Sequence, residues 1–341
     1  MLTNYLPVAD ALERLISVEM RRPANQGVIT LLTEAARAKQ GGRPPILTAA
    51  ERLKAVVKPG DVVIIATGLL VPEVMPAGEG DGPPGAAALA YALNRGLGAV
   101  PVVLAEPECM PPTQAALTAI GLRERPLAVA AEIPSSVVTI SSFPCDGRPD
   151  ADQAEAVADR MIAELKPKAI IEIEKIGLNA AGIAHRGGGA ACMDGRMRIE
   201  VLTEKARQAG IVTIAIGDLG NETGVGLIAD ECKQVWKWGA HCKCPCDQGI
   251  AVAEVSDITV MAQVSNWGGY AIAAMLGILL GKEEVLHSVE AERHMLEDCQ
   301  RAGAVDGITV GHDYSVDGIA GHVHCNLIDM MHHIMHMSLA Y

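Results

Sequence analysis

Two glycine-rich turns carry the carboxylates that could do chemistry in this chain. The first spans residues 78–85 and reads Gly-Glu-Gly-Asp-Gly-Pro-Pro-Gly, and the second spans residues 217–226 and reads Gly-Asp-Leu-Gly-Asn-Glu-Thr-Gly-Val-Gly. Each follows an apolar run typical of a strand and precedes a run typical of a helix. Glycine lets backbone N–H groups approach a ligand closely, and a helix N-terminus favours anions. We therefore expect Glu79, Asp81, Asp218 and Glu222 to meet a ligand or a metal in one site.

Each turn also has a purely structural interpretation. Proline suits the first turn of a helix, so Asp81 would then be an N-terminal cap, whereas Glu79 has no such local role. Gly224 and Gly226 would permit close helix packing. They also fit a loose dinucleotide fingerprint, but they follow a polar Asn-Glu-Thr stretch instead of a strand end. We therefore expect no nucleotide here.

A glycine-rich loop after the fourth expected strand holds the best histidine candidate. His185 follows Asn179 and precedes Arg186. A loop histidine can move a proton, and an arginine can bind a carboxylate in a bidentate manner. We expect this loop to contribute to the same site as the two turns.

Three cysteines at alternate positions, Cys242, Cys244 and Cys246, form the most conspicuous thiol motif. A zinc site needs four ligands, and no second close cysteine pair appears. Cys192, Cys232 or His241 would complete such a site only if the fold brought them close. A redox disulfide would have awkward geometry at a spacing of one residue. A partly buried turn of thiols is the preferred interpretation.

Histidines also accumulate near the C-terminus. His332 and His336 would share one helical face, which makes them a candidate metal pair. A helix so close to the chain end is more often solvated or at a subunit interface. The sequence leaves these alternatives open.

The elements that must position these residues alternate between apolar strands and helices. This rhythm is typical of a mostly parallel sheet with helices on both faces, here with extra helices at both termini. We divide the chain into a helical extension at 1–55 and a single α/β catalytic domain at 56–341. Strands are expected at 61–66, 99–104, 136–140, 169–173, 211–216 and 257–262. Helices are expected at 8–20, 28–38, 86–97, 112–120, 152–165, 197–209 and 222–238, followed by three closing helical stretches.

In a parallel sheet, ligands bind beyond the carboxyl ends of the strands. Glu174 and Lys175 follow the fourth expected strand, and Ser265 and Asn266 follow the sixth. Asn221 belongs to the second glycine-rich turn. Polar groups from several chain segments therefore converge on one edge of the sheet.

The composition excludes several classes of function. Of the 341 residues, 50% are hydrophobic and only 3% are aromatic, and the net charge is −13. Nucleic-acid binding calls for basic patches and often exposed aromatic residues, so we expect no nucleic-acid partner. The N-terminus lacks the pattern of a signal peptide, and no apolar stretch is long enough to span a membrane. We expect a cytoplasmic protein with nine reduced cysteines. The mostly apolar C-terminal helix is compatible with a homo-oligomer.

The two turns resemble those of the D-glutamate cyclase family, in its C-terminal, catalytic-type domain. The family reads approximately Gly-Glu-Thr-Asp-Gly-Pro-Pro-Gly-Ala at the first turn and Gly-Asp-Gly-Gly-Asn-Glu-Ile-Gly-Met-Gly at the second. Similar stretches occur at 264–268, 303–307 and 315–318, so the likeness runs from about residue 60 to 330. The chain departs from the family at Gly80, Leu219, Thr223 and Val225. These four positions are expected in the pocket, where they would affect the substrate.

The resemblance implies a lyase that closes D-glutamate to 5-oxo-D-proline, a lactam, with loss of water. It further implies a divalent metal, Mn²⁺ or Mg²⁺, held by Asp81 and Asp218, with Glu79 or Glu222 assisting. His185 or Glu174 would accept the ammonium proton, and Lys175 and Arg186 would pair with the α-carboxylate of the substrate. Asn179, Asn221, Ser265 and Asn266 are further candidates for substrate binding.

Two alternatives remain at this point. The first is a hydrolase or cyclase that acts on another lactam or cyclic amide with the same carboxylates. The second is a metal-binding or redox protein built on Cys242, Cys244 and Cys246.

Overall fold

The computed structural model describes residues 4–20 and 27–340. Within these ranges the chain forms a seven-stranded parallel sheet in the order β3-β4-β2-β1-β5-β6-β7. The α/β prediction is therefore confirmed, and each of the six expected strands is present. The short edge strand β3 and the antiparallel pair β8–β9 escaped prediction because two residues carry no periodicity. The strands are β1 Val62–Ala66, β2 Val100–Leu104, β3 Arg123–Glu124, β4 Ser136–Ile140, β5 Ala169–Ile173, β6 Val212–Gly217, β7 Ile258–Met261, β8 Ser315–Val316 and β9 Ile319–Ala320.

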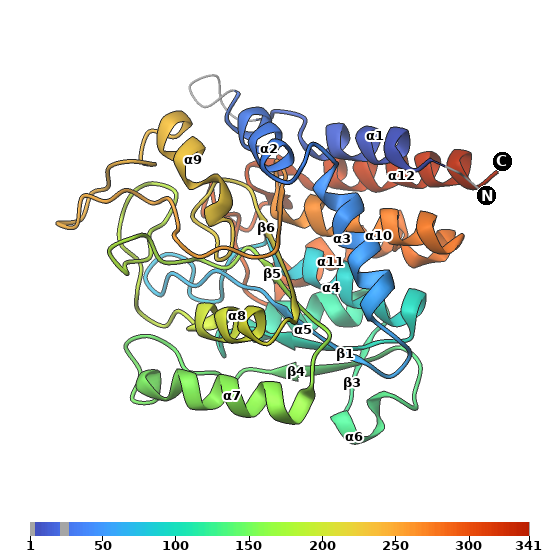
Figure 1. The fold of residues 1–341 in the computed structure, drawn as a ribbon, viewed down its shortest axis with the longest axis horizontal. Coiled ribbons are helices and arrows are strands. Elements are labelled where there is room, and N and C mark those ends of the chain that lie inside the picture. Colours follow the sequence, from blue (N-terminus) through green and yellow to red (C-terminus); the bar gives the residue numbers. More distant parts are fainter. Residues whose placement is uncertain (1–3, 21–26, 341) are drawn as a thin grey trace.

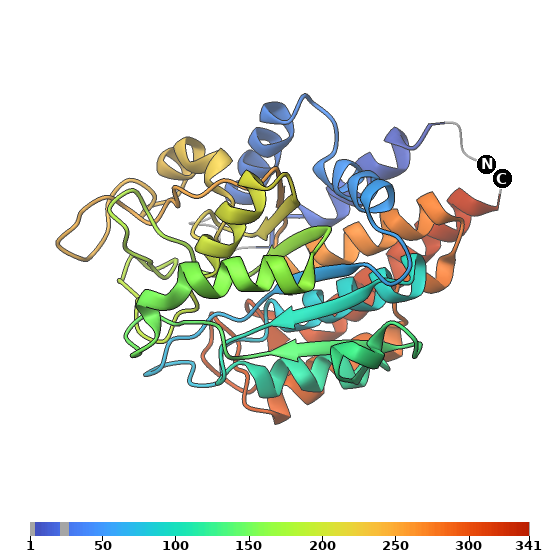
Figure 2. The ribbon, with the colours of Figure 1, turned by 60° about the horizontal axis from the view of Figure 1, so that its bottom comes forward.

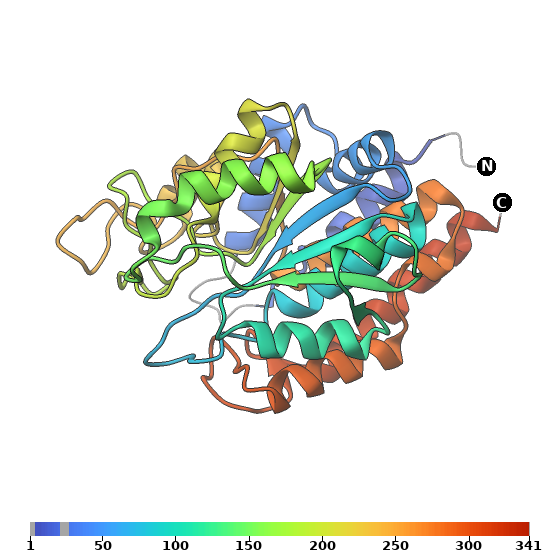
Figure 3. The same ribbon diagram turned by 90° about the horizontal axis from the view of Figure 1, so that it is seen from below.

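Helices cover both faces of the sheet (Figures 1, 2 and 3). One face packs against α7 and α8, and the other packs against α3, α4 and α10. The α-helices are α1 Leu6–Ile16, α2 Val28–Lys39, α3 Pro45–Val56, α4 Pro83–Ala92, α5 Met110–Ala119, α6 Leu127–Ala130, α7 Ala154–Leu165, α8 Ile199–Gln208, α9 Ala229–Val235, α10 Ser265–Leu280, α11 Val289–Arg301 and α12 Gly321–Leu339. Every residue of β1, β2, β5, β6 and β7 is buried, as expected for strands that are apolar throughout.

The N-terminal helices pack against the rest of the chain. Residues of α1 and α3 belong to the same hydrophobic core as α4, α10 and α12, and α1 lies beside α12 (Figure 1). α2 packs instead against α9 and the end of β7. The domain boundary at residue 55 stays a prediction.

Helices α4 and α10 are packed unusually closely because two glycines face each other. A Cβ atom at Gly85 would lie 2.8 Å from the Cα atom of Asn266 and 2.5 Å from the Cδ1 atom of Ile173. A Cβ atom at Gly269 would lie 3.0 Å from the carbonyl oxygen of Gly85. Only residues without a side chain permit this approach. It brings the N-termini of the two helices together at the carboxyl edge of the sheet.

Candidate active site

The N-termini of α4 and α10 cap each other. Asp81 accepts hydrogen bonds from the backbone N–H groups of Ser265 and Asn266, each at 2.8 Å, and from that of Gly82 at 2.9 Å. The side-chain oxygen of Asn266 accepts in return from the N–H groups of Gly82 and Gly85, at 3.0 and 2.7 Å. Asp81 is thus a cap, but of α10 and not only of its own helix. These bonds satisfy donors that a helix N-terminus would otherwise leave unpaired.

Three carboxylates gather beside these helix ends. Glu174, Asp218 and Glu222 each offer an oxygen, and these oxygens lie within 4.8 Å of one another. Glu174 follows β5, and its backbone lies in the left-handed region, at φ 48°. It accepts a 2.6 Å hydrogen bond from the hydroxyl of Ser265. The carboxyl ends of β5 and β6 and the start of α10 therefore meet at one point, as the sequence predicted.

Glu222 folds back onto its own turn. Its carboxylate accepts from the N–H groups of Leu219 and Gly220, at 3.0 and 2.8 Å. A Cβ atom at Gly217 would lie 2.4 Å from this carboxylate, so the turn requires glycine there. The expected helix over 222–238 is wrong in its first part. Gly224 adopts φ +85°, and regular α-helix is confined to α9, after a 3₁₀ turn at Gly226–Ile228.

Burial and neighbouring carboxylates raise the pKa of four acidic side chains at this edge of the sheet. Burial, followed by neighbouring carboxylates, raises the pKa of Glu79 and of Glu174 well above the ordinary value. The same two causes raise the pKa of Asp81 to about 7, against the three N–H donors that lower it. Burial, with Asp218 beside it, raises the pKa of Glu222 to about 8. Such a group must hold protons or a cation at neutral pH. Its oxygen donors suit a hard divalent cation such as Mg²⁺ or Mn²⁺.

Asp306 is an acidic residue near the first glycine-rich turn to which the sequence analysis gave no role. Segment 303–318 joins the first turn through Val305, whose carbonyl accepts from the N–H of Gly80 at 2.8 Å. Asp306 holds this segment together by accepting from Ser315 at 2.6 Å and from the N–H of Gly318 at 2.7 Å. A Cβ atom at Gly307 would collide with the carboxylate of Glu79, at 2.0 Å. The two Val-Asp-Gly stretches, at 305–307 and 316–318, were the sequence feature that could have pointed to this segment.

A family model described as "D-glutamate cyclase-like, C-terminal" matches residues 12–332. The chain belongs to this D-glutamate cyclase-like family. It is also 37% identical to the human protein "D-glutamate cyclase, mitochondrial" over 70 residues, which are 20% of this chain and 10% of that protein. The matched stretch thus covers only a small part of that relative's length.

The departures from the D-glutamate cyclase-like pattern mostly lie outside the pocket that the sequence assigned to them. Leu219 and Val225 are buried in the core between α2 and α9. The hydroxyl of Thr223 donates to the carbonyl of Ile176 at 3.0 Å. Gly80 lies against Val316, which a Cβ atom would approach to 3.2 Å. The side chains of Leu219, Thr223 and Val225 therefore face protein and not substrate.

Lys175 lies next to Glu174 in the chain but forms a separate, buried ion pair. Its ammonium group contacts the carboxylate of Glu106 and donates to the carbonyl of Gly68 at 2.8 Å. Both charged side chains are at most 1% exposed. Glu106 also accepts from the N–H of Met197 at 2.9 Å. The pair ties together the segments after β1, β2 and β5.

The remaining predicted residues bring the loop after β5 against the loop after α9. Asn179 donates to the carbonyl of Gly249 at 2.8 Å, and Asn221 donates to that of His185 at 3.2 Å. The two nitrogens of His185 contact the carbonyl of Ile183 at 3.0 Å and the sulfur of Cys244 at 3.2 Å. Burial lowers the pKa of His185. Arg186 is half-buried on the same loop.

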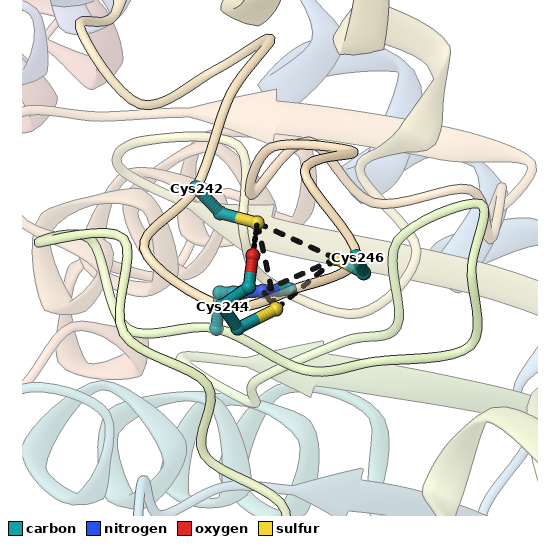
Figure 4. A group of neighbouring side chains, drawn as sticks. Cys242, Cys244 and Cys246 are labelled. Carbon is teal, nitrogen blue, oxygen red and sulfur yellow. Dashed lines mark hydrogen bonds between the residues drawn. The ribbon is translucent and has the colours of Figure 1, made fainter.

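The three cysteines of the loop after α9 turn toward one another (Figure 4). Of the partners that the sequence suggested for them, Cys192 donates instead to the carbonyl of Leu70, and His241 contacts Asp247. His185 is the residue that reaches the cysteines. All nine cysteines are free.

The C-terminal histidines have separate partners. The ring of His332 contacts the carbonyl of His287 at 2.8 Å, and that of His336 contacts the carboxylate of Glu283 at 3.1 Å. Both line an open hollow on α12.

No helix among the described residues has the length and apolar character of a membrane span.

A second acidic group lies between β5 and α8. Glu172 accepts from the hydroxyls of Thr203 and Ser256, at 2.6 and 3.2 Å. Nearby, Glu254 accepts from the N–H of Leu178 at 3.0 Å. Burial raises the pKa of Glu254 to about 7, although hydrogen bonds from backbone N–H groups oppose the shift.

We expect Glu254→Gln to stabilise the protein increasingly as the pH rises. A carboxyl whose folded pKa is raised costs stability between its unfolded pKa and its folded pKa, so the cost is absent below about pH 4.5 and complete above about pH 7. Glutamine keeps an acceptor for Leu178 but carries no charge. Because Glu254 is half-buried, the effect is partly screened by solvent. We expect the stability advantage of Glu254→Gln over the wild type to grow by about 1 kcal/mol between about pH 5 and about pH 8. Urea unfolding at the two pH values measures it, and an equal gain at both would contradict the electrostatic cause.

Proposed function

We propose that the chain is a D-glutamate cyclase-like lyase, which closes D-glutamate to 5-oxo-D-proline and water with the help of a divalent cation, Mn²⁺ or Mg²⁺. The observation that carries this proposal is the convergence of Glu174, Asp218 and Glu222 beside the capped ends of α4 and α10. Membership of the family supports the same reaction.

The reaction forms one C–N bond and breaks one C–O bond. The amine nitrogen must lose two protons, and the departing side-chain oxygen must gain two to leave as water. Glu174 is our candidate to accept the first proton, because a carboxyl with a raised pKa is matched to proton transfer at neutral pH. Glu174 would pass this proton to the departing oxygen. A protonated Glu79 would supply the second proton to that oxygen and regain one from the amine, so that two protons move from the nitrogen to the leaving water. A cation bound here would polarise the substrate's side-chain carboxylate and stabilise the developing oxyanion.

The site residues divide by role in this proposal. Asp218 would hold the cation together with Glu174 and Glu222, and Asp81 would hold the helix N-terminus of α10 in place. Arg186 is the candidate for the substrate's α-carboxylate, since Lys175 is paired with Glu106. The ring nitrogens of His185 already have neighbours, which favours a carboxylate over histidine as the base.

The test compares turnover of D-glutamate and L-glutamate in Mn²⁺, in Mg²⁺ and in EDTA, with 5-oxoproline followed by chromatography. We expect product from the D-isomer, abolished by EDTA and restored by either cation. Product that forms equally from both isomers, or that is unaffected by EDTA, would contradict the proposal. If neither isomer reacts, a panel of lactams and cyclic amides tests the alternative that the same carboxylates hydrolyse or close another ring.

A further inference from the structure

Four potential metal ligands from two separate loops meet at the Cys242–Cys246 turn. The sulfur of Cys242 lies 3.5 Å from that of Cys244 and 3.4 Å from that of Cys246, and the last two sulfurs are 3.2 Å apart. The Nε2 atom of His185 lies 3.2 Å from the sulfur of Cys244 and 3.8 Å from that of Cys246. All four atoms fall within 4.8 Å of one another. In Figure 4 dashed lines join the three neighbouring cysteines.

These separations fit a single tetrahedral ion. A zinc ion that binds sulfur at about 2.3 Å sets its ligands roughly 3.7 Å apart. A disulfide would need two sulfurs at about 2.05 Å, far closer than any pair here. An iron–sulfur cluster contains several metal atoms and would hold its thiolates further apart than one ion does. Three thiolates and one imidazole are soft and borderline donors, which suit Zn²⁺ better than the hard cation expected at the carboxylates.

The surroundings of the four ligands orient them as an outer shell would. The Nδ1 atom of His185 lies 3.0 Å from the carbonyl of Ile183, so it carries the proton and leaves Nε2 as the ligand atom. The amide of Asn179 lies 3.5 Å from the sulfur of Cys246 and also binds the carbonyl of Gly249. Two lysines, Lys237 and Lys243, lie over the ring of Trp238, and Lys243 belongs to the cysteine turn itself.

We propose that Cys242, Cys244, Cys246 and His185 bind one structural Zn²⁺, distinct from the cation at the carboxylates. With four protein ligands the site has no open position for a substrate, which is typical of a structural and not a catalytic ion. The ion would fasten the loop after α9 to the loop after β5. The carbonyl of His185 also accepts a hydrogen bond from the side chain of Asn221. Because Asn221 precedes Glu222 in the chain, the zinc site is connected to the carboxylate site.

The experiment first measures the zinc content of the purified protein by elemental mass spectrometry. Zn²⁺ is then exchanged for Co²⁺, whose absorption spectrum reports the geometry of the site. We expect about one Zn²⁺ per chain, and a Co²⁺ form with the intense absorption of a tetrahedral thiolate site. Cys244→Ser and His185→Gln should each weaken zinc binding by more than the roughly 100-fold that loss of an outer-shell partner costs. Cys325→Ser, a buried cysteine on α12, is the matched control and should keep full zinc content.

Several outcomes would overturn the proposal. These are a zinc affinity in His185→Gln equal to that of the wild type, a visible iron–sulfur spectrum, a disulfide among the three cysteines, or a wild-type protein that takes up no zinc when reduced and supplied with it. The wild-type measurements decide the matter even if a variant fails to fold. The outcome is independent of cyclase activity, because the carboxylate variants should retain this zinc.

Discussion

Asp218→Asn and Glu174→Gln should each lower kcat/KM for D-glutamate by at least about 100-fold, the lower end of the range for loss of a general acid or base. Both changes preserve shape while removing a negative charge from the group Glu174, Asp218 and Glu222. Asp218→Asn would weaken cation binding, and Glu174→Gln would also remove the proton acceptor. Steady-state kinetics over a range of Mn²⁺ concentrations separates these two effects.

Glu174→Gln should not lose stability in EDTA. Burial and neighbouring carboxylates raise the pKa of Glu174, so ionising this side chain destabilises the folded state. A neutral glutamine relieves this repulsion and can still accept the hydrogen bond from Ser265. We expect an unchanged or higher melting temperature at neutral pH together with the loss of activity. This opposition between stability and activity is typical of catalytic groups.

Added Mn²⁺ gives a second measure that does not depend on turnover. A ligand that binds only the folded state at about 100 times its dissociation constant stabilises it by about 2.7 kcal/mol. We therefore expect Mn²⁺ to raise the melting temperature of the wild type but not of Asp218→Asn. Asp159→Asn, an exposed acid paired with Lys205, should behave like the wild type in every assay. A wild-type response to Mn²⁺ in Asp218→Asn would remove Asp218 from the cation site.

The sequence predicted the sheet and the position of the carboxylates for a simple physical reason. Strands that are apolar throughout indicate a parallel sheet, and the carboxyl ends of parallel strands share one edge. Any acid that follows β5 or β6 must therefore lie near that edge, as Glu174 and Asp218 do. The glycines were informative because close approach requires them, as at Gly85 and Gly217.

Side-chain direction within irregular loops could not be predicted in this way. Asp306 accepts hydrogen bonds within its own loop. That loop reaches the first glycine-rich turn only through a long-range bridge between Val305 and Glu79. His185 meets three cysteines that lie more than fifty residues further along the chain. No periodicity in the sequence reports such contacts, because neither partner belongs to a regular element.

Glu174 and Lys175 illustrate how the backbone decides such cases. Glu174 adopts φ 48°, so the chain turns at this residue and the two neighbouring side chains enter different environments. Glu174 meets the carboxylates, whereas Lys175 meets Glu106. The sequence assigned Lys175 to the substrate because a cation beside a carboxylate site is chemically attractive. The buried ion pair with Glu106 supports a different role, which stability measurements can test.

Replacing Glu106 by alanine should destabilise the protein by about 3–5 kcal/mol, the cost of leaving a buried charge without its partner. Lys175→Met should cost a similar amount, because it leaves the carboxylate of Glu106 unpaired. The double variant Lys175→Met/Glu106→Gln should recover most of that loss. It removes both charges, and glutamine keeps an acceptor for the N–H of Met197. Urea unfolding of the wild type, Lys175→Met, Glu106→Gln and the double variant gives the coupling free energy.

The exposed pair between Lys205 and Asp159 is the matched control. Asp159 is 65% exposed, so water solvates each charge when the other is removed, and Lys205→Met should change the free energy of unfolding by less than about 1 kcal/mol. Kinetics of Lys175→Met at a temperature where it remains folded then decides its role. If Lys175 bound the α-carboxylate of the substrate, KM would rise sharply in both the single and the double variant while stability changed little. A buried structural pair predicts the reverse, a large loss of stability in Lys175→Met that the double variant repairs, with KM close to that of the wild type.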